Sequence, residues 1–216
     1  MNLPGNTSFE LIQSKLDIEL INYFCPVSNV IPNIDSKGIY FWFMKQDAYS
    51  LLSQYITMSP IEPKFSKTIN GKSYDMVYLG TAGTGKKGNS NLKNRFEWHI
   101  NQKHSESTIK QKQSALSTLR TGLSSLLSDD LILPNTEIIV NDFMSSKMLL
   151  FYIKYENNNE IINSDEIILI KNLKPLFNLK NNPNSYKHSI SNPTKDYKFR
   201  RNFIEKNTKI RLGVIK

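Results

Sequence analysis

The chain has 216 residues, and its 39% hydrophobic content is enough to build the core of one domain of ordinary size. Its single cysteine excludes a disulfide framework and a cysteine-ligated zinc site within one chain, which fits a reducing compartment. The sequence contains neither a long apolar run of membrane-spanning length nor a signal-peptide pattern, so we expect a soluble cytoplasmic protein that does not contact a membrane.

The formal net charge of +9 is concentrated in two parts of the sequence. Residues 180–216 carry ten Lys or Arg and two acidic residues, and residues 86–120 carry eight against two. Positive charge clustered in this way favours a surface that binds a polyanion by displacing its counterions. The alternative is a solvated basic face without a ligand. On the first interpretation we expect contacts with a polyanion such as DNA from basic side chains of the two blocks: Lys86, Lys87, Lys93, Arg120, Lys198, Arg200 and Arg201.

The first part of the chain predicts a helix and two neighbouring strands. Apolar residues at helical spacing predict the helix over residues 9–24. The apolar, aromatic run at residues 38–43 is typical of a buried strand. Asn70-Gly71 is a hairpin signal, and residues 74–79 form the strand that follows it. We therefore expect the two strands to lie side by side in one small sheet.

Helices and a loop are expected around and after these strands. Residues 48–55 predict a short helix, and residues 81–91 contain three glycines and predict a loop. Apolar residues at every fourth position then predict the buried stripe of a helix over residues 91–103. Leucines at helical spacing predict a second helix over residues 116–127.

The remainder of the chain predicts two strands and two helices. Residues 137–140 and 148–155 have the composition of strands. A helix is expected over residues 165–173, stopping before Pro175. The sequence beyond is polar, basic and irregular, with a short helix expected at residues 199–206.

Arg95 and His99 are four residues apart, so they share one face of the predicted helix. A guanidinium there can bind two phosphate oxygens at once, a geometry that lysine cannot copy. Each residue also has an ordinary interpretation, as an exposed helix arginine and as a histidine at the surface or core edge. The helix therefore offers a phosphate-binding face without requiring one.

Glu166 lies in the first turn of the helix expected at residues 165–173. The positive end of a helix favours an ionised carboxylate, which is a ligand that hard metal ions prefer. Asn163 to Glu166 also matches a capping box, in which the glutamate bonds back to the residue at the helix start. Both interpretations stay open.

Tyr40 and Tyr78 would, by default, be ordinary strand tyrosines. An unperturbed phenol, with a pKa of about 10, is a poor base at neutral pH. A catalytic Tyr40 would therefore need cationic neighbours that lower its pKa, and residues 86–95 could supply them.

Four segments of the chain form a joint pattern. Gly38-Ile39-Tyr40 and Tyr78-Leu79-Gly80 are two similar tripeptides on the expected strands. Residues 92–99 contain an arginine and, one turn further, a histidine. Residues 166–178 begin with a glutamate and end with an asparagine after a proline-containing turn. In this order the segments resemble the GIY-YIG nuclease superfamily, most closely its restriction endonucleases, with leucine for isoleucine in the second signature.

The resemblance implies an α+β fold with a small three-stranded antiparallel sheet flanked by helices. A nuclease-like core would occupy residues 37–179, after an N-terminal helical extension at residues 1–36. The basic extension at residues 180–216 would pack on the core or continue it. The helix at 114–127 and the strands at 137–155 would be insertions into the core.

The implied reaction is metal-dependent hydrolysis of a phosphodiester in double-stranded DNA, leaving 5'-phosphate and 3'-hydroxyl ends. The metal would be Mg²⁺ or another divalent ion such as Mn²⁺. A single active site cuts both strands only as a homodimer or in two successive nicks, and both alternatives stay open. The resemblance implies these roles: Tyr40 activates or orients the attacking water, Tyr78 holds the phosphate or assists Tyr40, Arg95 neutralises charge on the phosphorus, His99 supports Tyr40 or the phosphate, Glu166 binds the metal, and Asn178 positions that region.

Two other classes of function stay open. Residues 80–86 fit most of a phosphate-cradling P-loop, which would make the chain a nucleotide hydrolase or kinase. That motif requires Ser or Thr after its lysine, whereas Lys87 is there. The loop also continues through Asn91, where a P-loop would already have begun its helix. The other class is a non-catalytic DNA-binding module that keeps the scaffold.

Overall fold

The protein is described by a computed structural model that covers residues 23–24, 31–52, 65–84, 90–100, 105–112, 117–156, 159–182 and 197–215. The helix expected at residues 9–24 lies almost entirely outside these ranges. Its expected last two residues, Tyr23–Phe24, form a short strand instead.

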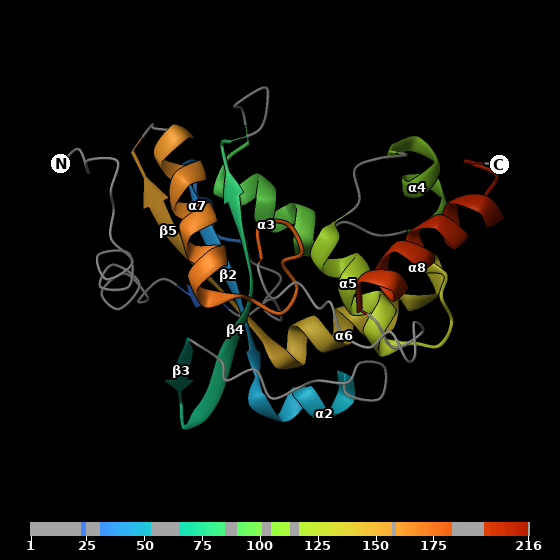
Figure 1. Ribbon diagram of the computed structural model, residues 1–216, viewed down its shortest axis with the longest axis horizontal. Coiled ribbons are helices and arrows are strands. Elements are labelled where there is room, and N and C mark those ends of the chain that lie inside the picture. The colour runs from blue at the N-terminus through green and yellow to red at the C-terminus, as the bar shows by residue number, and fades with distance from the viewer. Residues whose placement is uncertain are drawn as a thin grey trace.

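The fold is α+β, with one antiparallel sheet flanked by helices (Figure 1). The sheet has five strands in the described part of the chain instead of the expected three: three long strands form its centre, and two short strands extend its edges. β2 is paired with β5 on one side and β4 on the other. The strand order is β1 (Tyr23–Phe24), β5 (Met148–Tyr155), β2 (Lys37–Lys45), β4 (Lys72–Ala82) and β3 (Ser66–Ile69).

Helices cover both faces of the sheet, which explains the unbroken apolar run in β2. Ile39, Phe41 and Phe43 face one core, to which α7 contributes its apolar side. The alternate side chains of β2 face the other core, built with α3, α5 and α6. The helical elements of the described chain are the 3-10 turns η2 (Gln46–Ala48) and η3 (Leu133–Thr136) and the helices α2 (Tyr49–Leu52), α3 (Leu92–Ile100), α4 (Glu106–Lys112), α5 (Thr118–Leu127), α6 (Glu137–Lys147), α7 (Asn159–Leu173) and α8 (Tyr197–Arg211).

The expected hairpin at Asn70-Gly71 is confirmed. Both residues have positive φ, 49° and 71°, and they join β3 to β4. The tripeptides containing Tyr40 and Tyr78 therefore lie on adjacent strands, with Tyr40 directly opposite Gly80.

Two strand predictions need correction. Residues 137–140 are the first turn of α6, because Val140, Phe143 and Met144 bury one side of a helix while Ile138 and Ile139 face solvent. A short apolar run does not distinguish helix from strand by itself. β5 is a strand as expected, but it pairs with β2 over residues 37–44, so it belongs to the centre of the sheet and is not an insertion.

Two helices are longer than predicted. α7 begins at Asn159 instead of residue 165, because Ile162 continues the buried stripe of Leu169 and Leu173 toward the N-terminus. α8 has 15 residues, so it is longer than the short helix expected at residues 199–206, and it packs on α5. None of the helices in the described part of the chain is both long and apolar enough to span a membrane.

Candidate active site

The glycines of the two tripeptides lie where a side chain would collide with a neighbouring atom. A Cβ on Gly80 would lie 2.6 Å from Cζ of Tyr40 and closer still to its Oη, and a Cβ on Gly38 would overlap the carbonyl oxygen of Ile153. No other residue can occupy these positions without moving a neighbour. Gly80 thus allows the Tyr40 ring to lie directly over β4, and Gly38 allows β2 to lie close to Ile153 of β5.

The Tyr40 phenol is the first member of a buried hydrogen-bonded chain. Its Oη lies 2.7 Å from Nε2 of His99, and Nδ1 of His99 lies 2.9 Å from Oγ of Ser117. Ser117 is the N-cap of α5, where its Oγ also accepts the backbone N–H of Arg120. The chain therefore connects a strand, the helix that carries His99 and the start of α5. The pattern of a serine before a leucine-rich helix is the signal that could have identified Ser117 in the sequence.

Burial dominates the electrostatics of these groups. It raises the pKa of Tyr40 well above its usual value, and the adjacent Arg95 lowers that pKa in part. Burial, with Arg95 and Arg120 nearby, holds the pKa of His99 well below its usual value. A cation does lie near Tyr40, as required, but it does not outweigh desolvation. In the DNA-free protein, Tyr40 is therefore a phenol and His99 a neutral imidazole.

Arg95 lies beside the two phenols. It projects from α3, and its Nε donates to the carbonyl oxygen of Thr81 at 3.1 Å, at the end of β4. Its charge lowers the pKa values of Tyr40 and Tyr78. The helix face predicted from the spacing of Arg95 and His99 is thus turned toward the sheet.

Glu166 reaches the same region from the opposite face of the sheet. Because α7 begins at Asn159, Glu166 lies about two turns inside the helix and is not part of a capping box. Burial raises its pKa, while Arg95 and Lys180 lower it. The negative charge of Glu166 in turn raises the pKa values of both Tyr40 and Tyr78.

Asn178 connects the end of α7 to the second tripeptide. Its Oδ1 accepts the backbone N–H of Leu79 and its Nδ2 donates to the Leu79 carbonyl oxygen, both at 2.9 Å. Phe177 N–H donates to the carbonyl oxygen of Val77 at 2.8 Å. The segment thus forms hydrogen bonds with backbone groups of β4, as an adjacent strand would. Both ends of the Asn178 amide are hydrogen-bonded to the backbone of Leu79, and the residue also lines a cavity beside Tyr78.

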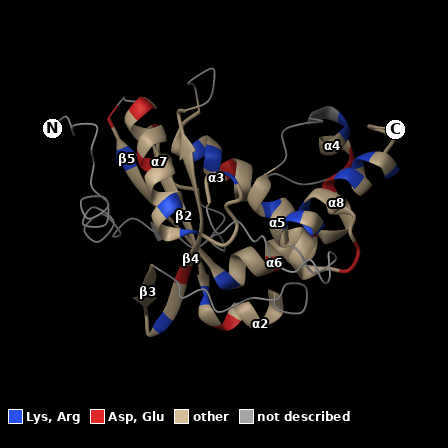
Figure 2. Ribbon diagram, viewed as in Figure 1, with Lys and Arg blue, Asp and Glu red and all other residues tan. Residues whose placement is uncertain are grey.

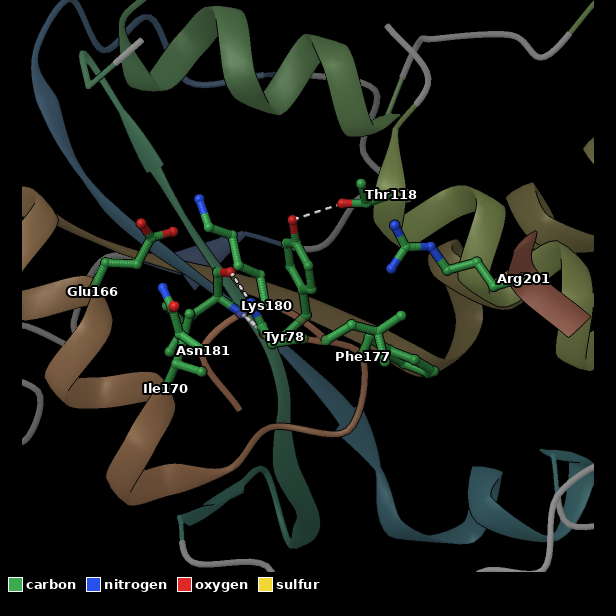
Figure 3. Close-up of a pocket in the computed structure, with 11 residues that line it drawn as sticks. Tyr78, Thr118, Glu166, Ile170, Phe177, Lys180, Asn181 and Arg201 are labelled. Carbon is green, nitrogen blue, oxygen red and sulfur yellow. Dashed lines mark hydrogen bonds between the residues drawn. The ribbon is translucent and has the colours of Figure 1, made fainter. Parts of the chain in front are cut away.

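A cavity of about 280 Å³ opens beside Tyr78 (Figure 3). Glu166 and Lys180 lie at one side of Tyr78 in this view, and Arg201 of α8 lies at the other. The Tyr78 hydroxyl is 3.0 Å from Oγ1 of Thr118. Lys180 and Thr118 are residues that the motifs did not indicate, although Lys180 follows the matched asparagine by only two positions.

A known protein family matches most of this chain. A family model described as the GIY-YIG catalytic domain matches residues 38–200. The chain belongs to the GIY-YIG nuclease family. No curated protein and no solved structure matches it. The match includes the two tripeptides, α3 and the segment from Glu166 to Asn178.

Membership of the GIY-YIG family replaces the P-loop interpretation. Gly80 is inside β4 and gives space to a tyrosine ring, and the following helix begins only at Leu92. A P-loop requires its glycines in the loop and its helix directly after the lysine. Residues 85–89 lie outside the described residues.

The donor set of this GIY-YIG site fits a hard divalent ion. The described residues contain no group of three or more His, Cys, Asp or Glu side chains that could hold a metal, which argues against a zinc-type site in this part of the chain. Mg²⁺ needs only one or two carboxylates because water and substrate phosphates complete its coordination. Glu166 is the acidic side chain among the described residues that line the cavity.

Two of the expected DNA contacts are wrong. Arg120 is only 1% exposed, and its guanidinium donates to Glu137 and Asn141 at 2.9 and 2.6 Å. Arg200 is 7% exposed and donates to the carbonyl oxygens of Ser125 and Ser128. Both arginines join elements of the fold, so neither can bind DNA in this state.

The other expected contacts differ in position. Lys198 is exposed on α8, along which several Lys and Arg residues are spread (Figure 2), and Lys93 is partly exposed on α3. Arg201 faces the cavity instead of the outer surface. Lys86 and Lys87 lie outside the described residues.

Proposed function

We propose that this GIY-YIG protein is a divalent-metal-dependent DNA endonuclease of the restriction type, which leaves 5'-phosphate and 3'-hydroxyl ends. The observation that carries the proposal is the electrostatic contact among Tyr40, Arg95 and Glu166, which come from a strand and two helices on opposite faces of the sheet. Glu166 lines the cavity, and its charge and that of Arg95 both act on the buried Tyr40 phenol. A phenol, a guanidinium and a carboxylate grouped in this way suit phosphodiester hydrolysis.

Tyr40 acts as the base in its ionised form and takes a proton from the attacking water. Because its pKa is lowered, His99 is a neutral imidazole with one N–H. A phenolate at Tyr40 can only accept, so we assign the tautomer with hydrogen on Nε2. Ser117 Oγ–H then donates to Nδ1, and Nε2–H donates to the Tyr40 oxygen. This chain stabilises the phenolate when it forms.

Arg95 stabilises charge that develops on the phosphorus oxygens, as preorganised donors do in other hydrolases. Glu166 would hold the metal together with oxygens of the substrate. The ion supplies Lewis-acid stabilisation of the leaving oxygen. Asn178 keeps the Glu166 helix and the Tyr78 strand in register through its two bonds to Leu79.

We further propose a homodimer that cuts double-stranded DNA in the cytoplasm. One cavity of this size admits one strand, so two copies would be needed for a concerted double-strand cut. The single cysteine supports a reducing compartment.

The test compares Glu166→Gln with the wild-type protein on plasmid DNA, with Mg²⁺ and with chelator. Glu160→Gln is the matched control, because it removes an exposed carboxylate from the first turn of the same helix. We expect Glu166→Gln to slow cutting at least about a hundredfold. DNA affinity should change little, since it comes from basic side chains. Glu160→Gln should cut normally.

Four outcomes would refute the proposal. Normal cutting by Glu166→Gln would show that Glu166 is not the metal ligand. Cutting in excess chelator would show that the reaction needs no metal. A DNA gel shift without any cutting by the wild type would favour the non-catalytic DNA-binding module. Turnover of ATP instead would favour the nucleotide hydrolase.

A further inference from the structure

The cavity beside Tyr78 is completed by a helix from outside the expected nuclease core. Arg201 is on α8, one residue beyond the range that the family model matches. Nevertheless it lines the same cavity as Glu166, Tyr78 and Lys180. In Figure 3 its guanidinium is directed toward the side of Tyr78 that faces away from Glu166.

The Nε atom of Arg201 is the unusual feature of this side. It is buried, and it has no hydrogen-bond partner among the described residues. A buried donor without an acceptor costs about 1–3 kcal/mol, and more when the group is charged. Such groups are rare in folded proteins, and a ligand that supplies the acceptor is one explanation.

The charge of Arg201 also acts on the cavity wall. Burial raises the pKa of Tyr78, and the charge of Arg201 offsets part of this rise. Burial likewise raises the pKa of Tyr197 to about 12, and the charge of Arg201 and a side-chain hydrogen bond between the two residues offset part of it. The guanidinium therefore lies close to two phenols that desolvation keeps neutral. Neither phenol neutralises its positive charge.

α8 is held firmly on both sides of Arg201. The Tyr197 ring packs over Gly122, where a Cβ would overlap its hydroxyl. Arg200 donates to the Ser125 carbonyl oxygen at 2.7 Å, and Oγ1 of Thr208 accepts the backbone N–H of Leu133 at 2.9 Å. A side chain on a helix anchored in this way is preorganised, as a ligand-binding group requires.

We propose that Arg201 is a second phosphate-binding arginine of the active site, which binds a phosphate oxygen of the cleaved DNA strand on the side of Tyr78 away from Glu166. This inference rests on the proposed nuclease function. The planar guanidinium offers Nε–H and Nη–H as a pair of donors that match two phosphate oxygens. The basic C-terminal segment thus supports cleavage itself in addition to DNA affinity.

Point variants test this better than removal of the segment, because truncation would strip Tyr197 and Ile204 from the core. Arg201→Gln removes the guanidinium, and Arg201→Lys keeps the charge without the fork. Lys206→Gln is the matched control, since it removes one positive charge from the exposed side of the same helix. Single-turnover cutting is measured at saturating DNA, with unfolding temperatures to confirm the fold.

We expect Arg201→Gln to cut at least about tenfold more slowly, as for loss of a charged hydrogen bond. Arg201→Lys should recover only part of the rate, and Lys206→Gln should cut at the wild-type rate. An Arg201→Gln protein that is folded and cuts as fast as Lys206→Gln would overturn the proposal.

A binding measurement keeps this test separate from the proposed function. The slope of log affinity against log salt becomes shallower by about 0.9 for each phosphate that the protein no longer neutralises. We expect this shallower slope in Arg201→Gln whether or not the wild type cuts DNA. If the wild type binds DNA without cutting it and the slope still becomes shallower, the proposed function is wrong but the phosphate site is supported. An unchanged slope, or no DNA binding by the wild type, would overturn the site.

Substrates with one neutral methylphosphonate next to the cut show which phosphate Arg201 binds, when the cutting rates of the wild type and Arg201→Gln are compared. If Arg201 binds a flanking phosphate, neutralising that phosphate should slow the wild type and have no further effect on Arg201→Gln. If it binds the scissile phosphate, each flanking substitution should slow both proteins by the same factor.

Discussion

Replacing Gly80 by alanine tests whether the place of the Tyr40 ring determines cutting. The added Cβ would lie 2.6 Å from Cζ of Tyr40, whereas ordinary contact begins at 3.4 Å, so the ring must retreat by about 0.8 Å. The ring is 0% exposed and lies between Tyr78, Phe96 and His99 at centroid distances of 6.5, 6.0 and 5.3 Å. It has no open space to retreat into.

Two consequences of Gly80→Ala have a magnitude. Overpacking a core costs about 1–3 kcal/mol, and each kcal/mol lowers the unfolding temperature by about 2–4 °C in a chain of this size. A displacement of about 1 Å at a reacting group can cost about a hundredfold in rate. We therefore expect a protein that is folded at 25 °C and binds DNA, but cuts about a hundredfold more slowly at saturating DNA.

Gly71→Ala is the matched control for this change. Gly71 has a φ of +71° and a Cβ there would meet no atom within 4 Å, so alanine introduces backbone strain of about 1–2 kcal/mol without touching Tyr40. Both variants should lose stability, but only Gly80→Ala should lose rate. Equal single-turnover rates for the two variants would show that Gly80 is not needed to place the Tyr40 phenol for cutting.

The base and the residue that orients it can be tested by two further measurements. Because the pKa of Tyr40 lies well above its usual value, the phenolate fraction and hence the cutting rate should rise about tenfold per pH unit from pH 7 to 9, with no step from His99, whose pKa is well below this range. Tyr78→Phe should keep this rise of the cutting rate with pH, whereas the residual cutting by Tyr40→Phe should not depend on pH. A wild-type rate that does not change from pH 7 to 9 would exclude Tyr40 as the base. Ser117→Ala should cut about tenfold more slowly with the same pH slope and lose about 1 kcal/mol of stability as an N-cap, and an unchanged rate would show that Ser117 does not orient His99.

The adjacency of the two tripeptides was predictable because it depends on local signals. Asn70-Gly71 sets the turn, and the period of a strand then sets which residues face each other. The helix face with Arg95 and His99 was predictable for the same reason, since residues four apart must share a face. Each of these inferences needs only a segment of the chain and its immediate neighbour.

Other predictions failed where the deciding contact is distant in sequence. Arg120 is indistinguishable from a surface arginine until α6 brings Glu137 and Asn141 to it. The sequence from Asn163 to Glu166 fits a capping box, but Ile162 packs in the core and draws the helix one and a half turns further back. Local pattern and tertiary burial compete at both positions, and burial wins.

The same burial explains why the site is electrostatically incomplete without its substrate. Desolvation raises the pKa values of Tyr40, Tyr78 and Glu166, so all three acids are shifted toward their neutral forms, while Arg95 and Arg201 keep their charges nearby. Of the two phenols, Tyr78 lines the cavity and Tyr40 is fully buried behind it. On the proposed mechanism, a phosphodiester that enters the cavity meets the Arg201 guanidinium, which lines it. The Tyr40 phenol can then take a proton only after water has reached a group that the DNA-free protein keeps fully buried. This order makes water access, and not only the protonation of Tyr40, part of what DNA binding has to accomplish.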